Sequence, residues 1–537
     1  MSDSPILIAG AGPTGLVLAL ALARRGIPIR LIAEAPGPGA HSRAMAVHAR
    51  TLEFYRQFGF ADEVVAEGVV ADAVHLREVD AEGTGIDVTT FRFDDLGGGI
   101  SPYPFVLTYA QDLHERFLIG KLAGLGVQPE WNTRLEAVEL TLGSALARLR
   151  LPDGRAEAMR ASYVAGCDGA HSQVRHSLGI GFAGGTYDQL FHVADVRLEG
   201  PFDHELQANL GPRILELVMP VRATGMSRLI GLVPPHLSSR SDLTFDDVRG
   251  HIETLIGRRV MEVNWFSAYR VHHRVADHFR VGRAFLAGDA GHVHSPAGGQ
   301  GMNTGIGDAV NLGWKLAQVW LGRAPDNLLD SYETERIGFA RRLVATTDRA
   351  FRPMVAPGLG GEAMRRLVAP VLASIASHLA FARRALFRAV SQTEIHYPDS
   401  ALSRGRAGDV RGGDRLPWIA DPDNFAPLRS LDWQVHVFAA PDAATRGEAS
   451  RDDALRDEAL RPLCVQAGLP VHALPWTPAA ASAGFVQDGV YLVRPDGHVA
   501  VAAAGDAAAT GIETFLRETG LQGTIMPAVA ARRRAHR

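Results

Sequence analysis

Cysteine is nearly absent from this chain: its 537 residues include two, Cys167 and Cys464, far apart in sequence. This excludes a disulfide framework, a CxxC redox pair and a cysteine-based zinc site, and it is typical of a protein in a reducing compartment. Long apolar runs are also missing, because residues 16–23 are too few to span a bilayer and no basic segment precedes them. We therefore expect a soluble, cytoplasmic protein with no membrane partner.

A strong excess of one charge is lacking as well. The formal net charge is −4 and 21% of the residues are charged, so the composition gives no reason to expect a nucleic acid or an anionic membrane as partner. The basic run 532–537 is short and typical of a solvated tail. No cluster of ligand residues indicates a metal. The length exceeds what one hydrophobic core supports, so we expect two or three domains.

A dinucleotide fingerprint lies at the start of the chain. The apolar run 6–9 predicts a buried strand, residues 16–25 predict a helix, and 29–32 predict a second strand. Glycines between strand and helix allow a tight turn close to a pyrophosphate, and the acid after the second strand suits a ribose without a 2′-phosphate, as in FAD or NAD. The predicted contacts are Gly10, Gly12, Pro13, Thr14, Gly15, Glu34 and Ala35.

A second glycine-rich stretch follows the predicted strand 284–287. The strand stops at Gly288-Asp289, a loop with further glycines follows, and a helical pattern extends from Asn303 to Leu316. A carboxylate can accept hydrogen bonds from hydroxyls, and the free N–H groups at a helix start attract negative charge. The stretch therefore predicts a site for a polyol or an anionic group.

The same stretch resembles a known flavin motif. Residues 288–292, with Pro296 and residues 298–303, are similar to the second flavin motif of the single-component (class A) FAD-dependent aromatic hydroxylases, the family of para-hydroxybenzoate hydroxylase, phenol hydroxylase and the aromatic polyketide hydroxylases. Asp168-Gly169, with Ser172, Val174 and Arg175, resembles the family's DG motif, although it could also be an ordinary capped helix start. The order of the three motifs favours one discontinuous FAD domain.

The resemblance implies a set of cofactor contacts. It predicts noncovalent FAD, with NAD(P)H as a transient co-substrate, because one GxGxxG leaves no second nucleotide domain. An arginine in the loop after the first motif should contact the cofactor, and Arg43 or Arg50 could serve. The further contacts that the resemblance implies are Gln111, Asp168, Gly169, Gly288, Asp289, Pro296, Gly299, Gly301, Met302 and Asn303.

The resemblance also implies an activity. The chain is expected to be a monooxygenase that uses NAD(P)H and O2 to hydroxylate a phenolic or polycyclic aromatic substrate through a flavin C4a-hydroperoxide. Two alternatives stay open: a Baeyer–Villiger or epoxidising monooxygenase on the same fold, and a non-catalytic flavoprotein that sequesters an aromatic ligand. A homodimer is possible.

The predicted fold is α/β. A Rossmann-like FAD domain is expected over 1–180 and, with the GD motif and a helical segment, over 282–397. A mixed β-sheet domain for the substrate is inserted at 181–281, a linker covers 398–415, and 416–537 resembles a thioredoxin-like domain without CxxC. The helix after Tyr332 is predicted to expose Glu335 and Arg336. No catalytic residue is assigned, since one sequence does not fix strand register; the substrate-pocket candidates are Tyr187, His192, Arg213, Tyr269 and Pro296.

Overall fold

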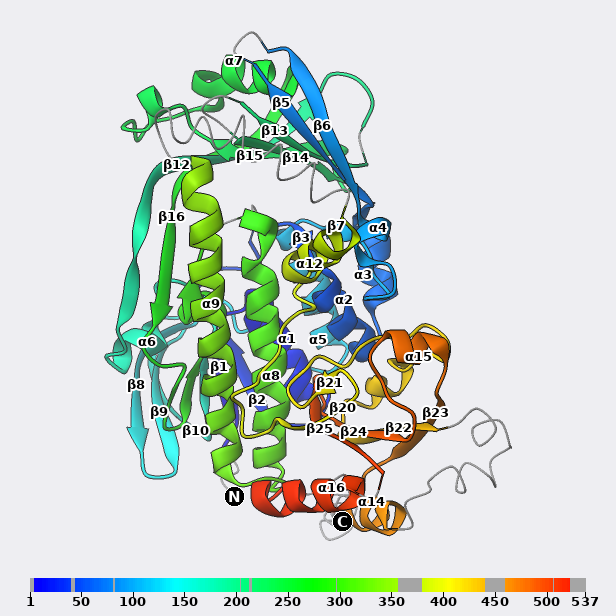
Figure 1. Ribbon diagram of the computed structural model, residues 1–537. Coiled ribbons are helices and arrows are strands. Elements are labelled where there is room, and N and C mark those ends of the chain that lie inside the picture. Colours follow the sequence, from blue (N-terminus) through cyan, green and yellow to red (C-terminus); the bar gives the residue numbers. More distant parts are fainter. Residues whose placement is uncertain are drawn as a thin grey trace.

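The computed structural model describes residues 4–39, 44–80, 83–202, 204–211, 215–295, 297–355, 379–439, 459–505 and 507–521 (Figure 1). The predictions for Arg43, Arg213 and Pro296 lie outside these residues. Within them, no helix combines the length and the apolar character that crossing a membrane would require.

A parallel sheet forms the centre of the FAD domain. Its strand order is β17-β18-β11-β1-β2, in which only the edge strand β17 runs antiparallel. The strands are β1 (Ile6–Ala9), β2 (Ile29–Ile32), β11 (Val164–Gly166), β17 (Arg280–Val281) and β18 (Ala284–Leu286). Every residue of β1, β11 and β18 is buried, which explains why these strands are uniformly apolar or small. The strands predicted around the three motifs are confirmed.

Helices and two small sheets surround this centre. Long helices α8 (Gly301–Trp320) and α9 (Asp330–Val355) stand side by side in Figure 1, and α8 packs closely on α1 (Pro13–Ala23). The remaining helices of this part are α2 (Ala49–Phe58), α3 (Ala61–Glu67), α4 (Phe93–Gly97), α5 (Gln111–Ala123), α6 (Gln173–Ser177) and α12 (Ala380–Val390). The small sheets are β3 (Ala46–Val47), β7 (Val106–Thr108) and β4 (Val69–Ala71), and the meander β8 (Arg134–Thr141), β9 (Ser144–Arg150) and β10 (Ala156–Ala161).

A large mixed sheet forms the upper part of the molecule in Figure 1. Its order is β19-β16-β12-β15-β14-β13-β5-β6. Five strands come from the predicted insertion: β12 (Phe182–Leu198), β13 (Leu206–Leu210), β14 (Leu215–Val221), β15 (Met226–Leu232) and β16 (Val260–Ala276). The other three, β5 (Ala73–Val79), β6 (Gly85–Arg92) and β19 (His292–Val293), come from segments that the sequence assigned to the FAD domain. Helix α7 (Phe245–Ile256) covers one face.

The C-terminal unit contains a six-stranded sheet of order β21-β20-β25-β24-β22-β23. Strands β22 (Gln434–Ala439), β23 (Val471–Pro475), β24 (Gly489–Val493) and β25 (Val499–Ala504), with α14 (Leu460–Ala467), α15 (Pro478–Ser482) and α16 (Ala507–Thr519), form the thioredoxin-like core. Strands β22, β24 and β25 are buried almost throughout, which matches their apolar sequence.

The linker predicted over 398–415 is wrong. The segment contains β20 (Arg404–Ala407) and β21 (Val410–Arg411), and β20 pairs with β25. Its glycines serve close packing: a Cβ on Gly405, whose φ is +72°, would lie 2.4 Å from the carbonyl oxygen of Ala502. The glycines and charges that predicted a linker therefore belong to a segment that pairs with the C-terminal sheet.

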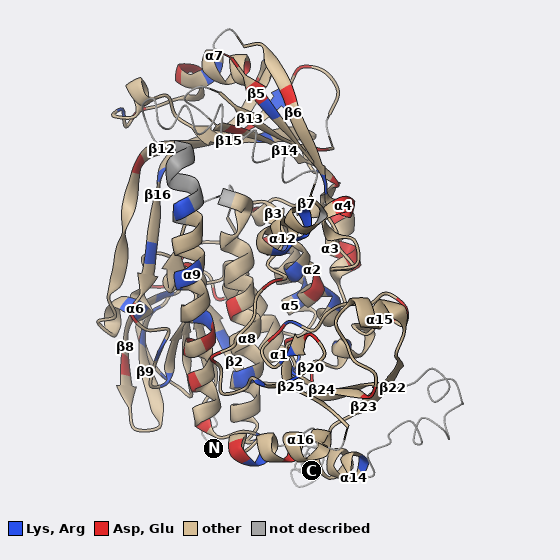
Figure 2. Cartoon of the chain, in the orientation of Figure 1, with Lys and Arg blue, Asp and Glu red and all other residues tan. Residues whose placement is uncertain are grey.

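Charged residues also line the interior of the FAD domain. Figure 2 shows charged segments along both α8 and α9. The prediction that Glu335 and Arg336 are exposed is wrong, because they are only 2% and 1% exposed. Each is buried against a partner of opposite charge: Glu335 pairs with Lys315 and Arg336 with Asp308.

Candidate active site

The three motifs meet at one edge of the parallel sheet. Since β1, β11 and β18 run parallel, the residues that follow them lie side by side. A Cβ on Gly10 would come within 2.2 Å of the Cys167 carbonyl oxygen, and one on Gly288 within 2.5 Å of Thr14 Oγ1. The close approaches require glycine at both positions, and they join the first motif to the other two.

The start of α1 is open to an anion. Gly12 precedes the helix without a side-chain cap, the first turn contains no acidic residue, and an added Cβ on Gly12 would meet nothing within 4 Å. The first N–H groups of a helix need partners and carry partial positive charge. Glu34, exposed just after β2, lies where a ribose would follow the pyrophosphate. This end of the site therefore suits a dinucleotide.

The DG motif is a capped helix start in which one carboxylate oxygen of Asp168 takes no part in the capping. Asp168 Oδ2 accepts hydrogen bonds from the N–H groups of Gln173 (2.7 Å) and Val174 (3.2 Å) at the start of α6. The second carboxylate oxygen, Oδ1, is buried and has no partner among the described residues. Burial raises the pKa of this carboxyl, and the hydrogen bonds that it accepts oppose the rise. Local capping thus accounts for half of the carboxylate, and the other half is available to a ligand.

The GD turn is held from behind by a second acid. Asp308 Oδ2 accepts hydrogen bonds from the N–H of Gly288 (2.9 Å) and from His292 Nε2 (2.8 Å). Asp289 itself is reachable from solvent but closely surrounded by protein, and this desolvation raises the pKa of its carboxyl. The turn therefore presents one carboxylate outward while another fixes its backbone.

The start of α8 is organised by Asn303. Its side-chain oxygen accepts from the N–H of His48 (2.9 Å) and from Thr51 Oγ1 (2.8 Å), and its amide nitrogen donates to the carbonyls of Ala46 and Gly299, both at 2.9 Å. The amide is thus fully occupied by protein groups. Only the backbone of Asn303 is therefore left for a cofactor contact.

Comparison with known proteins identifies the family. The sequence profile of the FAD binding domain family matches residues 3–347. The 6-methylpretetramide 4-monooxygenase of Streptomyces rimosus is 36% identical over 93% of this chain and 91% of its own length. Pentachlorophenol 4-monooxygenase of Sphingobium chlorophenolicum is 31% identical over 78% of this chain and 76% of its own length. The flavin-dependent monooxygenase PieE, solved with FAD and substrate, superposes with a TM-score of 0.74 at 25% identity over 97% of this chain and all of its own.

The chain belongs to the FAD-dependent aromatic monooxygenases. FAD is its cofactor, and the groups described above fit it: an uncapped helix start for the pyrophosphate, an accessible carboxylate at Asp289 for hydroxyls, and an unpaired oxygen on Asp168. Within the described ranges, no three His, Cys, Asp or Glu side chains gather in a way that could hold a metal ion.

Two further predicted FAD contacts have other partners in the monooxygenase. Arg50 is buried and points to the C-terminal unit, where its guanidinium donates to the carbonyl of Asp496 at 2.7 Å. Gln111 begins α5 and donates to Glu115 at 2.8 Å, while its N–H donates to the carbonyl of Ala44. Gln111 therefore borders the loop after the first motif, whereas Arg50 belongs to an interface between domains.

The substrate-pocket candidate His192 lies on the face of the large sheet away from the motifs. Its Nε2 is 3.1 Å from Glu216 Oε1, both side chains are fully buried, and its ring stacks on Phe266. Phe266 in turn contacts Phe245 of α7, which covers this face. His192 therefore lies on the α7 side of the sheet, a placement that one sequence does not fix because strand register is open.

The two tyrosine candidates lie in a small apolar cluster at one end of the sheet. Tyr187 packs on the ring of His273 (4.7 Å between centroids), and Tyr269 faces Phe191 across the β12–β16 pair. The cluster is completed by Val79, Leu232, Leu255 and Val271. Leu255 belongs to α7, so this cluster joins the sheet to that helix.

An ion pair that the sequence did not predict lies between the large sheet and the segment at Ala44, which follows the first motif. Arg228 on β15 makes a bidentate contact with Asp195 on β12, at 2.7 and 2.8 Å, and also reaches the carbonyl of Ala44 at 3.4 Å. A charged residue opposite an acid on a neighbouring strand would be the sequence signal, but the pairing of β12 with β15 had first to be known.

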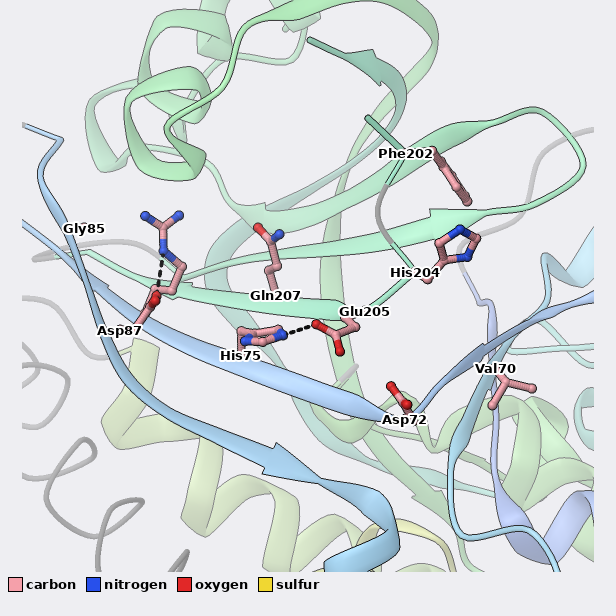
Figure 3. Close-up of a pocket in the computed structure, with 10 residues that line it drawn as sticks. Val70, Asp72, His75, Gly85, Asp87, Phe202, His204, Glu205 and Gln207 are labelled. Carbon is pink, nitrogen blue, oxygen red and sulfur yellow. Dashed lines mark hydrogen bonds and ion pairs between the residues drawn. The ribbon is translucent and has the colours of Figure 1, made fainter. Parts of the chain in front are cut away.

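A wide hollow elsewhere in the molecule does not coincide with this site. It measures about 740 Å³ and lies against β5, β6 and β13 (Figure 3). It is strongly polar: Figure 3 shows His75 joined to Glu205, and Arg77 pairs with Asp87 at 3.2 Å. None of its lining residues belongs to the three motifs. Shape alone would therefore misplace the active site, whereas the motifs locate it.

Proposed function

We propose that the monooxygenase uses NAD(P)H to reduce FAD and then inserts one atom of O2 into a phenolic or polycyclic aromatic ring. The balance is substrate, O2, NAD(P)H and a proton giving hydroxylated product, NAD(P)+ and water. The observation that carries the proposal is the convergence of the three motifs at one sheet edge. Reduced flavin supplies the oxygen chemistry; the protein binds, orients and excludes water.

The protein's own groups support this division of work. We propose that the start of α1 holds the pyrophosphate, Glu34 the adenosine ribose, and Asp289 the ribityl hydroxyls. The start of α8, where Gly301 and Met302 lie, would stabilise negative charge on reduced flavin, because its free N–H groups carry partial positive charge. NAD(P)H would dock transiently, since the sequence has one GxGxxG.

The aromatic substrate is proposed to bind between the flavin motifs and the large sheet. The Asp195–Arg228 pair supports this position, because it is almost fully buried and contacts the carbonyl of Ala44, in the segment that follows the first motif. Trp265, with its ring centre 6.0 Å from the Arg228 guanidinium, adds an aromatic surface. A buried cation beside an aromatic ring suits a planar ligand with a phenol or enol oxygen.

The proposed division of the chain follows the same evidence. FAD would be bound by segments of 1–180 and 282–397, and the substrate chiefly by 181–281, with β5, β6 and β19 added to that sheet. The C-terminal unit, with Cys464 buried and far from Cys167 in sequence, would have no redox role.

A substrate screen tests the proposal. Purified enzyme with FAD is mixed with NADH or NADPH and a panel of phenols, naphthols and linear polycyclic quinones, and nucleotide consumption is followed at 340 nm. Compounds that stimulate consumption are then analysed by mass spectrometry. A ring product with one added oxygen supports hydroxylation, whereas a lactone or epoxide supports the Baeyer–Villiger or epoxidising alternative. Tight binding of an aromatic compound without nucleotide consumption would support a sequestering flavoprotein.

A further inference from the structure

Among the contacts between the C-terminal unit and the FAD domain is a buried turn between β24 and β25, residues 494–498. Arg494, Asp496 and His498 are each at most 2% exposed. Their charges are therefore paired inside the protein. Arg494 donates to Asp496 at 2.6 and 3.1 Å, and His498 Nδ1 is 3.3 Å from Asp496. A buried charged turn of this kind requires partners on the domain that it faces.

Those partners lie on α8 and α9. Arg494 donates to both oxygens of Glu335, at 2.8 and 2.9 Å, and Lys315 donates to the same carboxylate at 2.7 Å. Trp314 Nε1 donates to Asp496 at 3.0 Å. The turn thus fixes α8 and α9 relative to each other, at a point on α8 well past its start.

Tyr397 continues the contact toward the flavin. Its ring lies 4.7 Å from that of His498, and the Arg494 guanidinium lies over it at 5.4 Å. Its hydroxyl accepts a hydrogen bond from Arg336 Nη1 at 3.0 Å. A cavity of about 10 Å³, lined in part by Tyr397, Arg336 and His498, lies at the same junction and has room for about one water molecule. Tyr397 is therefore clamped between the turn and Arg336.

Arg336 completes the path to the GD turn. Its Nε donates to Asp308 Oδ1 at 2.5 Å, and its Nη2 donates to the carbonyl of Thr304 at 3.1 Å. The other oxygen of Asp308 holds the N–H of Gly288 and the ring of His292. All of these groups are buried, so each hydrogen bond is shielded from water and each lost partner is costly.

We propose that the 494–498 turn is a positioning element of the FAD site. Through Tyr397, Arg336 and Asp308 it holds the Gly288–Asp289 turn where the Asp289 carboxylate can meet the ribityl chain. Tyr397, Arg336 and Asp308 are positioning residues in this scheme, since they act on the cofactor through the backbone of Gly288. The thioredoxin-like unit would then contribute to cofactor binding without any cysteine chemistry.

The variant Tyr397→Phe tests the path at its narrowest point. It removes the acceptor for Arg336 and keeps the ring against His498. The matched control is Tyr491→Phe, which removes another buried tyrosine hydroxyl of the C-terminal part, one that donates to the carbonyl of Ala407 and has no link to the GD turn. The measurement is the FAD dissociation constant of apo-enzyme by flavin fluorescence, together with the visible spectrum of bound FAD, with no aromatic substrate present.

We expect the dissociation constant to rise roughly ten-fold for Tyr397→Phe, the scale of one hydrogen bond to a charged group, with a shifted flavin band. Tyr491→Phe should lower the melting temperature and leave both FAD readouts unchanged. Unchanged FAD binding in Tyr397→Phe, or an equal change in both variants, would overturn the proposal. If Tyr397→Phe does not fold, Arg494→Lys is judged by the same criteria. Because no substrate is used, failure here leaves the hydroxylase assignment standing.

Discussion

The flavin motifs and the 494–498 turn use carboxylates in opposite ways. At the motifs, Asp168 keeps one buried oxygen without a partner among the described residues, and Asp289 is reachable from solvent. At the turn, the Glu335 carboxylate accepts hydrogen bonds from Asn311, Lys315, Ser400 and Arg494. Buried polar groups normally find partners. An oxygen left unpaired beside open glycine backbone therefore indicates a ligand site, and a saturated carboxylate indicates architecture.

The glycines of the two regions differ in the same way. A Cβ on Gly12 would enter empty space, while one on Gly497 would lie 2.9 Å from Gln57 Nε2. Gly12 thus leaves room for a cofactor, and Gly497 lets two domains approach. Residue type alone does not separate these roles, but what each residue faces does.

The largest expected effect is a loss of stability on removal of a carboxylate whose oxygens are both hydrogen-bonded within the protein. Burial alone would raise the pKa of Glu335, but Arg494 and Lys315 hold it far below its usual value. Glu335→Gln leaves these two cations without their counter-charge and should cost about 3–5 kcal/mol of stability. The control, Asp330→Asn in the same helix, breaks a pair whose acid is 72% exposed and should cost less than about 1 kcal/mol. Denaturant unfolding compares the two, and equal losses would refute the distinction between the regions.

Acid should destabilise both regions through neutral histidines. His48 lies beside the start of α8, and His498 lies in the 494–498 turn. Burial lowers the pKa of each histidine to about 4. In the unfolded chain these histidines take up protons near pH 6.5, whereas in the folded protein they do so only near pH 4. The contribution of each neutral histidine to the free energy of unfolding is therefore fully present above pH 6.5. It is lost as the pH falls toward 4, by about 1.4 kcal/mol per pH unit for each histidine. Melting temperatures between pH 7.5 and 5 measure this. His498→Gln should flatten the curve, and a melting temperature independent of pH over this range would contradict the account.

Removal of an open carboxylate should affect binding more than folding. Asp289→Ala deletes an acceptor for the ribityl hydroxyls and should weaken FAD binding by about 1–3 kcal/mol. Because the side chain has no protein partner to lose among the described contacts, the melting temperature of the apo-protein should stay nearly constant. Titration with FAD and calorimetry of the apo-protein give the two numbers, with the exposed turn variant Asp153→Ala as control. A stability loss without a change in FAD affinity would reverse the roles assigned to the two regions.

The smallest effect is expected from the cysteines. Both are buried and neither forms a disulfide, and burial raises the pKa of the Cys167 thiol well above its usual value, so it is not poised as a nucleophile. Replacing both by serine should leave turnover nearly unchanged apart from small packing losses. Steady-state turnover per bound FAD is the measurement. A large fall with the flavin retained would show redox chemistry in the thiols.

The sequence predicted the parts of the molecule that depend on local pattern. The strands predicted at 6–9, 29–32 and 284–287 and the helix predicted over 303–316 are confirmed, because apolar runs and turn glycines specify them locally. The meeting of the motifs followed from their strands being parallel. These features need no knowledge of distant partners.

The errors all concern partners that lie far away in sequence. The face on which His192 lies could not be predicted, because strand register depends on pairing with β15 and β16. Glu335 and Arg336 were expected at the surface because charged side chains on a helix are usually exposed. They are buried because each forms an ion pair with a residue distant in sequence, Glu335 with Arg494 and Arg336 with Asp308. The segment 398–415 was predicted to be a linker, although Gly405 allows close contact with the carbonyl of Ala502.

The most direct test of the proposed function is oxygen transfer itself. With a substrate found by nucleotide consumption, the reaction is run under 18O2 in ordinary water, and product mass and NAD(P)H consumed are measured together. The account predicts one 18O atom in the aromatic product and about one NAD(P)H consumed per product formed. A product whose new oxygen comes from water, or nucleotide consumption that yields only hydrogen peroxide for every compound that binds, would contradict it.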